Sequence, residues 1–424
     1  MLLTSIILLL YLLFIGIGYW LKYLNLSYLK KHGSSVPLEF EGAIDPELLR
    51  KISAYTIENS RAGLAESIVS NAILLVFLFG GLLGLYDRWI ASLSSSFRTS
   101  GLLFALCLYL AQTAIDLPFS IYHHFTLEER YGFNTMTVRL WLTDLVKSLA
   151  ISLVLGGLVI AATLTLVSAS PSWWWFWVWA FLLAVGVFLM YISPTLIEPL
   201  FFKFETVKAE GLEEGIRELM ARAGLTVSRV FQVDASRRSR HSNAYFTGIG
   251  RVKRIVLFDT LIQQMSREEI LAVLAHEAGH WKRKHVLKRI VLTETFAFVG
   301  LFVAYHLVRW SGLPGLIGLQ QASFYARAMI VIFLGSLVTF PLTPLFSHLS
   351  RRDEHEADRF AAELSGNPEA MASSLVKLSR ENLSNLHPHP LYAAFFYSHP
   401  PVVERIRSLK GQNAEDRGQK AEAG

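Results

Sequence analysis

Charged residues and cysteine are both scarce in this chain of 424 residues. Asp, Glu, Lys and Arg together make up 17% of it, against about 25% in soluble globular proteins. This composition excludes a disordered chain, collagen and a nucleic-acid-binding tail. The single cysteine, Cys107, excludes an intramolecular disulfide and a zinc site built from cysteines. Hydrophobic residues account for 52% of the chain, and the positive mean hydropathy of +0.38 indicates that lipid is part of its solvent.

Seven windows of the sequence are apolar over the length of about 20 residues that a membrane-spanning helix needs. They are Met1–Trp20, Ser67–Tyr86, Gly101–Tyr122, Leu145–Val167, Trp173–Ile192, Ile290–Val308 and Tyr325–Phe346. The first has no basic segment before it and no small-residue cleavage site after it, so we expect a retained anchor rather than a signal peptide. The sequence therefore predicts a mainly α-helical, polytopic membrane protein with seven transmembrane helices.

Basic residues are unevenly distributed among the connections between these windows. The fourth connection, 168–172, has none, whereas the first connection holds Lys22, Lys30, Lys31, Arg50, Lys51 and Arg61. By the positive-inside rule we expect the odd-numbered connections and the C-terminus in the cytoplasm and the N-terminus outside. This topology accounts for the net charge of +6, so no nucleic-acid partner is expected. Short connections and the lack of a di-lysine signal at the end favour a bacterial inner membrane over the endoplasmic reticulum.

The windows divide the chain into five parts. Residues 1–201 hold the first five spans and their connections, and residues 290–346 hold the last two. Residues 202–289 and 347–411 are polar enough and long enough to fold, and they lie on the same predicted side of the membrane. We therefore expect them to build one site together. Residues 412–424 have almost no large apolar side chain, which predicts a disordered tail.

A zinc-protease motif lies in the first polar region. Ser266 and Glu269 have the spacing of a capping box, which predicts the start of a helix. That helix continues through His276-Glu-Ala-Gly-His280. Two histidines four residues apart share one face of a helix and can bind one zinc ion, while Glu277 between them can accept a proton from zinc-bound water.

A catalytic zinc needs a third protein ligand. His285 is the nearest histidine, but on a continuous helix a step of five residues turns it about 140° away from His280. Residues 281–284 contain no glycine that would bend the chain. We therefore do not expect His285 to bind the metal.

Two acidic residues after the last span are better candidates. Glu354 and Asp358 are again four residues apart on one helical face. One carboxylate can bind zinc while the other orients a ligating imidazole through its free N–H. The neighbouring Asp353 and Glu356 point elsewhere on that helix, so we expect them to be solvated charges.

These motifs resemble the CAAX prenyl protease family, the type I membrane zinc metallopeptidases that convert a-factor. The matching segments lie between residues 120 and 407. Besides His276–Trp281 and Glu354–Asp358 they are Phe125–Asn134, Pro194–Lys203, His241–Gly248, Ile255–Thr260 and Ser398–Arg405. The heat-inducible bacterial membrane peptidases share part of this pattern but have fewer spans, so they match less well.

The resemblance implies a fold in which seven helices enclose a water-filled chamber. A small α+β, gluzincin-like peptidase domain would hold one zinc ion at the cytoplasmic end of that chamber. His276, His280 and Glu354 would be the zinc ligands, Glu277 the general base and Asp358 the support of a ligand.

The resemblance also implies which residues meet a peptide substrate. His399 corresponds to a histidine that could hydrogen-bond the developing oxyanion. Arg351 and Arg405 could hold the carboxylates in place or meet the substrate's C-terminus. A segment beside the substrate is expected at Asn243, Ala244, Tyr245 and Phe246. It would be a short strand, either pairing with an extended peptide or serving as an ordinary strand of the domain.

The sequence thus predicts a membrane zinc endopeptidase that removes the C-terminal tripeptide from prenylated Cys-a-a-X substrates. Its partners would be a peptide or protein, prenylated or not, and the lipid bilayer. One alternative keeps the chemistry but replaces the substrate by misfolded or stalled membrane proteins. Another class of protein, a transporter or channel with a structural zinc, conflicts with the open coordination position and with Glu277 beside it.

Overall fold

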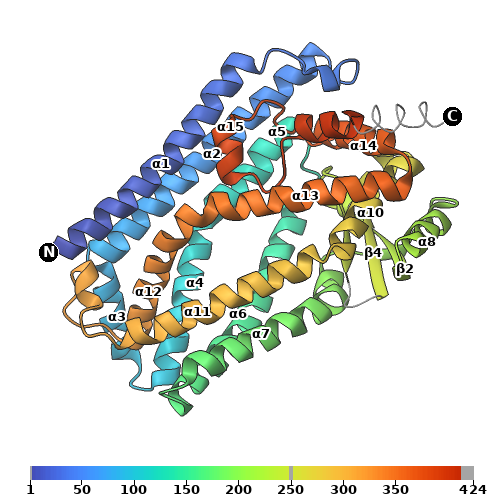
Figure 1. Ribbon diagram of the computed structural model, residues 1–424. Helices are drawn as coiled ribbons and strands as arrows, with labels where there is room; N and C mark the ends of the chain where they lie inside the picture. Colours follow the sequence, from blue (N-terminus) through green and yellow to red (C-terminus); the bar gives the residue numbers. More distant parts are fainter. Residues whose placement is uncertain (1, 248–251, 412–424) are drawn as a thin grey trace.

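The computed structural model describes residues 2–247 and 252–411 (Figure 1). Within them, seven helical segments are long and apolar enough to cross a membrane, which confirms the predicted fold class. Six of the segments contain α1 (Leu2–His32), α2 (Pro46–Phe79), α4 (Phe97–Tyr122), α6 (Val138–Ala169), α7 (Trp174–Ile192) and α11 (His285–Arg309). The seventh joins α12 (Phe324–Thr339) to α13 (Thr343–Ser365). At most 17% of the most apolar window of any span is buried, so the helices contact one another along narrow seams.

The second span ends earlier than the sequence predicts. α2 stops at Phe79, and a separate helix, α3 (Leu82–Leu93), follows it. Gly81 lies between them with a φ of 82°, a left-handed conformation that glycine adopts at little cost. The predicted window Ser67–Tyr86 runs across this break because both helices are apolar.

The polar residues after α7 form a small α+β domain at the end of the molecule remote from the N-terminus (Figure 1). Its sheet has the order β1-β2-β4-β3, in which β2 and β4 are parallel and the two outer strands are antiparallel to their neighbours. The strands are β1 (Phe204–Thr206), β2 (Thr226–Val233), β3 (Ala244–Thr247) and β4 (Val252–Phe258). The helices around the sheet are α8 (Leu212–Arg222), α9 (Asp259–Gln264) and α10 (Arg267–Lys282). The core joins α8, the sheet and α10 through fully buried Ile216, Ile255 and Leu274.

The second polar region packs against the first. It contains α14 (Pro368–Glu381), α15 (Pro390–Phe396) and a helical segment over 402–411. α11 and α13 each run without interruption from the membrane segment into this domain, so the predicted boundaries at 289/290 and 346/347 fall inside helices. The predicted disordered tail, 412–424, lies outside the described residues.

A hydrogen-bond network ties the domain to the membrane helices. Glu128 lies just after α4, before the short helix α5 (Glu129–Tyr131). Its carboxylate accepts a hydrogen bond of 2.7 Å from the hydroxyl group of Tyr55 on α2, and it lies 3.0 Å from Nε2 of His241. The other ring nitrogen of His241 is 3.0 Å from the side-chain oxygen of Asn382, which caps α14. One histidine thus links the bundle to both halves of the domain.

Candidate metal centre

The helix that carries the histidine pair begins where the sequence predicts. Ser266 and Glu269 complete a capping box: the Glu269 carboxylate accepts the Ser266 N–H at 2.8 Å, and Ser266 Oγ accepts the Glu269 N–H at 3.3 Å. The same carboxylate accepts hydrogen bonds from Ser373 and Lys377 of α14 at 2.6 and 2.7 Å. The start of α10 is therefore fixed against the second polar region.

Three side chains from α10 and α13 converge behind this cap. The Nε2 atoms of His276 and His280 lie 3.2 Å apart, and each is 3.3 Å from a carboxylate oxygen of Glu354. One atom from each residue can be chosen so that all three lie within 4.8 Å of one another. Glu354 is only 4% exposed. Two facing imidazole nitrogens and a buried carboxylate form the His₂Glu donor set of catalytic zinc sites, so these residues fit a zinc ion.

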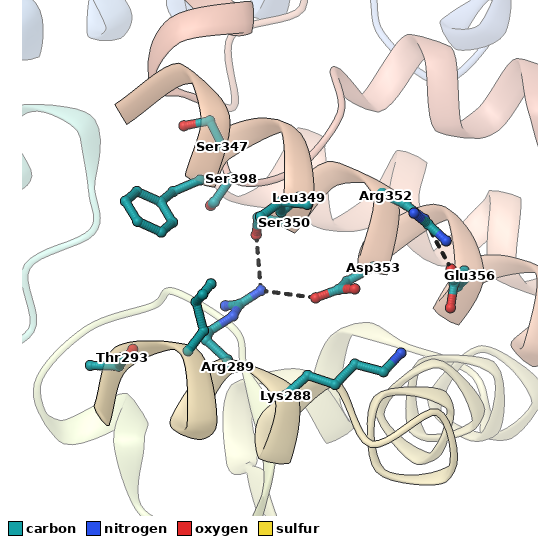
Figure 2. A pocket seen from close by; sticks show the side chains of 12 residues that line it. Lys288, Arg289, Thr293, Ser347, Leu349, Ser350, Arg352, Asp353, Glu356 and Ser398 are labelled. Carbon is teal, nitrogen blue, oxygen red and sulfur yellow. Dashed lines mark hydrogen bonds and ion pairs between the residues drawn. The ribbon is translucent and has the colours of Figure 1, made fainter. Parts of the chain in front are cut away.

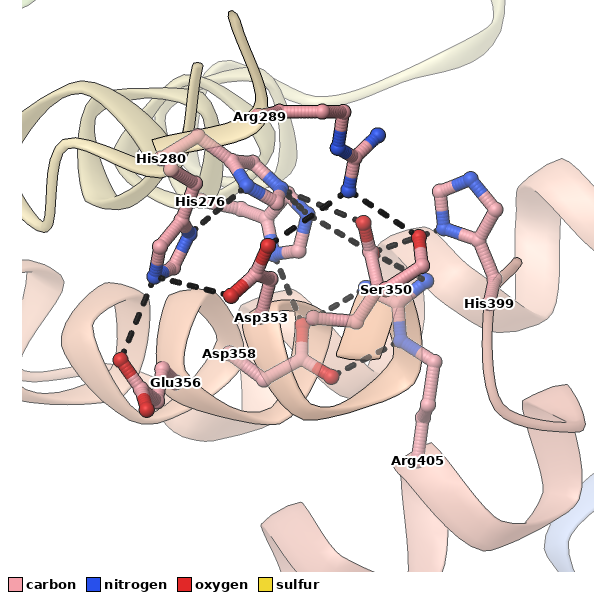
Figure 3. A network of polar contacts seen from close by, with 11 residues as sticks. His276, His280, Arg289, Ser350, Asp353, Glu356, Asp358, His399 and Arg405 are labelled. Atoms are coloured by element: carbon pink, nitrogen blue, oxygen red, sulfur yellow. Dashed lines mark hydrogen bonds and ion pairs between the residues drawn. The ribbon is translucent and has the colours of Figure 1, made fainter. Parts of the chain in front are cut away.

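Asp358 supports His276 from behind. Its carboxylate lies 2.8 Å from Nδ1 of His276, and Arg405 grips it with two hydrogen bonds of 2.8 and 2.6 Å (Figure 3). Burial lowers the pKa of His276, but hydrogen bonds to Asp358 and Glu354 outweigh it and raise that pKa to about 9. The two carboxylates thus favour the protonated ring when no metal is bound, and a metal ion must displace such a proton to bind.

Arg405 holds the acidic residues rather than facing the cavity. It is 9% exposed. Burial lowers its pKa, but the hydrogen bonds to Asp358 and the charges of Asp358, Glu354 and Glu277 together outweigh burial and raise it. The sequence leaves two roles open for Arg405, and the structure therefore supports holding the carboxylates in place over meeting the substrate's C-terminus. Figure 3 shows its guanidinium against Asp358, on the α13 side of the site.

The chain does not continue as one helix past the histidine pair, contrary to the expectation from the sequence. α10 ends at Lys282, Lys284 takes a left-handed conformation with a φ of 58°, and α11 begins at His285. This turn brings Nδ1 of His285 to 3.1 Å from Nδ1 of His280. The rotation argument therefore does not apply, although His285 still contacts the outer nitrogen of His280 and not the metal-facing one.

Asp353 and Glu356 are not the free solvated charges that the sequence predicts. Glu356 lies 3.2 Å from Nε2 of His285, and Asp353 lies 3.7 Å from the same atom. Asp353 also lies 3.5 Å from Arg289, which donates a hydrogen bond to Ser350 at 3.1 Å. Arg289, Asp353 and Glu356 line a pocket of about 510 Å³ between α11 and α13 (Figure 2).

A glycine lets the two metal-site helices approach closely. A Cβ at Gly279 would lie 3.1 Å from the Cα of Ala357 and 3.2 Å from its carbonyl oxygen. Ala275 and Ala278 on α10, like Ala357 itself, are fully buried. Small side chains at this crossing allow Glu354 to reach the histidines across the helix interface.

A cavity of about 780 Å³ opens onto the candidate ligands. Its lining includes Glu277, His399 and one side of α7 at Leu183, Gly186, Val187 and Met190. The strand β3 contributes Tyr245, Phe246 and Thr247 to the same wall, whereas Asn243 and Ala244 precede the wall and are not part of it. β3 is the edge strand of the sheet, so one of its edges has no strand partner among the described residues.

His399 enters the cavity from the loop that follows α15. Its Nδ1 lies 2.7 Å from the Glu354 carboxylate, and its side chain is 60% exposed. Arg351, which the sequence analysis expected either to hold the carboxylates or to meet the substrate, occupies a different place. Its guanidinium donates to the carbonyls of Ala393, Ala394 and Tyr397 at the end of α15, and it is absent from the cavity wall. Arg351 therefore caps α15 and holds the loop that presents His399.

Glu198 is a site residue that the sequence analysis missed. Its carboxylate accepts a hydrogen bond of 2.8 Å from the hydroxyl group of Tyr245, and it lines the cavity. It belongs to Pro194–Lys203, a segment matched to the family without a role for any residue. A glutamate between apolar residues at the end of a span was the signal available in the sequence.

Comparison with known proteins accounts for nearly the whole chain. A family model described as the CAAX prenyl protease N-terminal domain with five membrane helices matches residues 25–203, and the model of peptidase family M48 matches residues 207–413. CAAX prenyl protease 1 of Saccharomyces cerevisiae is 32% identical over 90% of each chain, and the Arabidopsis thaliana homologue is 35% identical over 89% of this chain and 91% of its own.

A solved structure has the same fold. The crystal structure of S. mikatae Ste24p is 31% identical in sequence, covers 96% of this chain and 99% of its own, and superposes with a TM-score of 0.89. These matches exclude the transporter or channel alternative, because both the family and the relatives are peptidases. The chain therefore belongs to peptidase family M48 and is a multi-pass membrane metalloprotease of the CAAX prenyl protease type.

Proposed function

We propose that this enzyme binds one zinc ion through His276, His280 and Glu354 and cleaves the C-terminal tripeptide from prenylated Cys-a-a-X proteins. The observation that carries the proposal is the convergence of this His₂Glu set, beside Glu277, on a cavity bordered by an edge strand. Zinc is the expected metal because its catalytic sites use such nitrogen and carboxylate donors and keep one position open.

The residues around the metal divide the work of hydrolysis. A bound zinc ion would polarise the scissile carbonyl and activate a water molecule. Glu277 accepts a proton from the attacking water and delivers it to the leaving amine. His399 faces the cavity beside Glu354 and hydrogen-bonds the oxygen on which negative charge develops. Asp358 and Arg405 keep His276 in its orientation.

The substrate peptide is bound as an added strand. β3 offers its free edge, and Tyr245 and Phe246 line the cavity next to the catalytic groups. Asn243 and Ala244, at the start of the strand, extend the same edge. Strand addition gains its affinity from main-chain hydrogen bonds, which suits a substrate whose residues after the cysteine vary.

Two features support a prenylated substrate. The cavity continues from the metal site along apolar residues of α7, such as Leu183 and Met190, where an isoprenoid chain would find apolar surface. The curated relatives carry the name CAAX prenyl protease 1. We place the cavity within a water-filled chamber between the spans, with the metal on the cytoplasmic side and the N-terminus outside, as the distribution of basic residues predicts. A bacterial inner membrane remains the location predicted from the sequence.

The decisive experiment compares a farnesylated Cys-a-a-X peptide with its unprenylated twin. The wild-type enzyme should release the tripeptide from the farnesylated peptide, and a zinc chelator should stop the reaction. Glu277→Gln should keep its metal and lose turnover, whereas Glu268→Gln, an exposed change on the same helix, should keep both its metal and its turnover. Equal cleavage of both peptides would replace the proposal by the quality-control alternative, and turnover by Glu277→Gln would refute the assigned base.

A further inference from the structure

We infer that His285 is a positioning residue for His280, which it orients through a hydrogen bond between their Nδ1 atoms, and that Glu356 in turn fixes His285. This inference rests on the proposed function, because it takes Nε2 of His280 as the atom that binds the metal. The contacts form a line from α10 through the start of α11 to α13. The distances along it are 3.1 Å from His280 to His285 and 3.2 Å from His285 to Glu356.

Only one placement of the ring protons allows both hydrogen bonds, from His280 to His285 and from His285 to Glu356. If Nε2 of His280 binds the metal, its Nδ1 carries the proton and must donate it. Nδ1 of His285 can accept this hydrogen bond only when His285 carries its own proton on Nε2. There the carboxylate of Glu356, and beyond it that of Asp353 at 3.7 Å, can accept it. The two histidines therefore take opposite tautomers, His280 with its proton on Nδ1 and His285 with its proton on Nε2.

The two metal-binding histidines are supported in different ways. His276 contacts the carboxylate of Asp358 directly. At Nδ1 of His280, the partner among the described residues is the neutral imidazole of His285, and the carboxylates lie one ring further out. Outer partners of this kind fix the tautomer and the ring orientation of a metal ligand. His285 is 2% exposed, so its ring has little freedom to leave this position.

The break between α10 and α11 makes the contact possible. Lys284 adopts a left-handed φ of 58°, which is uncommon outside glycine. The turn lets α11 start with His285 facing back toward His280. Such a conformation persists where surrounding contacts hold it, and the buried His285 ring supplies one of them.

The test measures metal binding rather than catalysis. Metal-free enzyme in detergent is titrated with Zn²⁺ against a chelator of known affinity, and the visible absorption of the Co²⁺-loaded protein is recorded. His285→Phe should weaken Zn²⁺ binding by about 10–100-fold and change the Co²⁺ spectrum, the size of effect typical for outer-shell partners. Glu356→Gln should weaken binding less, because its amide oxygen can still accept from His285. His306→Phe, the same change at an exposed position of α11, should match the wild type.

Two further variants keep the outcome interpretable. His285→Asn offers an oxygen near the place of Nδ1 and should recover most of the affinity even if the Phe ring disturbs packing. Unchanged Zn²⁺ affinity and Co²⁺ spectrum in both His285→Phe and Glu356→Gln would overturn the inference. Wild-type affinity in His280→Ala would instead refute the ligand set of the proposed function, so the two failures are distinguishable.

Discussion

At the scale of the residue, the metal ligands depend on partners that never face the substrate. Arg405 and Asp358 form a buried, doubly hydrogen-bonded pair, and Asp358 contacts His276. Such a pair costs desolvation of both ions, so it is weak evidence of added stability. Its clear effect is geometric, since the carboxylate cannot turn away from the imidazole while the guanidinium holds both of its oxygens.

Arg405→Met should destabilise the protein by up to about 3–5 kcal/mol, because the buried Asp358 carboxylate loses its doubly hydrogen-bonded guanidinium and keeps only the His276 ring beside it. Adding Asp358→Asn should restore part of that loss by removing the stranded charge. Unfolding of the metal-free protein in detergent measures both. The matched control is Arg407→Met on the same helical segment, where the arginine is exposed and pairs with Glu39. A loss no larger than in this control would contradict the assigned role.

At the scale of the element, the site depends on how closely α10 and α13 cross. Gly279 lies inside the histidine motif, where a glycine has no chemical task, and faces the backbone of Ala357. The helix pair that brings Glu354 to the histidines is thus built on small residues, and the cap at Ser266 fixes the start of one of the two helices. Packing and ligand geometry are determined by the same interface.

Gly279→Ala should push α10 and α13 apart by a few tenths of an ångström and cost about 1–3 kcal/mol, the usual range for overpacking. Zn²⁺ affinity should fall with stability, since Glu354 moves away from the histidines. Gly300→Ala on α11 is the control, because nothing lies within 4 Å of its added methyl group. Equal stability and affinity in the two variants would show that the crossing can relax freely.

The cap of α10 also predicts a pH dependence. Burial raises the pKa of Glu269, but hydrogen bonds from Lys377, Ser373 and the Ser266 backbone outweigh it and lower that pKa below its usual value. A lowered pKa in the folded state contributes stability above about pH 4.5, which is lost as the pH falls through the folded value.

Glu269→Gln should therefore destabilise the protein at neutral pH, and the deficit should shrink as the solution is acidified. Thermal unfolding of wild type and variant across the acidic range measures it, with exposed Glu268→Gln as the reference. A deficit that stays constant with pH would mean that the carboxylate charge does not matter to the cap.

At the scale of the whole molecule, what the sequence could predict follows from how local each signal is. Seven spans, the capping box and the helical pair His276 and His280 each depend on neighbours within a few turns, and the structure has them all, although its second span ends earlier than predicted. The break at Lys284 was missed because no glycine marks it in the sequence. The place of Arg351 was missed because its partners lie at the distant helix α15. Contacts between remote segments leave no periodic pattern in the sequence.

The hydrogen-bond network around His241 is one of these contacts, because it joins α2, Glu128 and α14. Burial lowers the pKa of His241, yet hydrogen bonds to Glu128 and Asn382 more than offset it, so the pKa is raised. The protonated ring can donate from both nitrogens. Its contribution to stability is therefore complete below about pH 6.5 and is lost as the pH rises through the folded value.

His241→Gln keeps a neutral donor but cannot titrate in this range, so it isolates the effect of the proton. The wild type should be more stable than this variant at mildly acidic pH, and the difference should narrow as the pH rises. Thermal unfolding of the metal-loaded proteins across this range tests it, with His306→Gln at an exposed site of α11 as the reference. Since the linkage joins the bundle to the domain, the variant should also unfold with its domain and membrane transitions further apart. Coincident transitions and a difference independent of pH would show that Glu128 holds the domain without a charged His241.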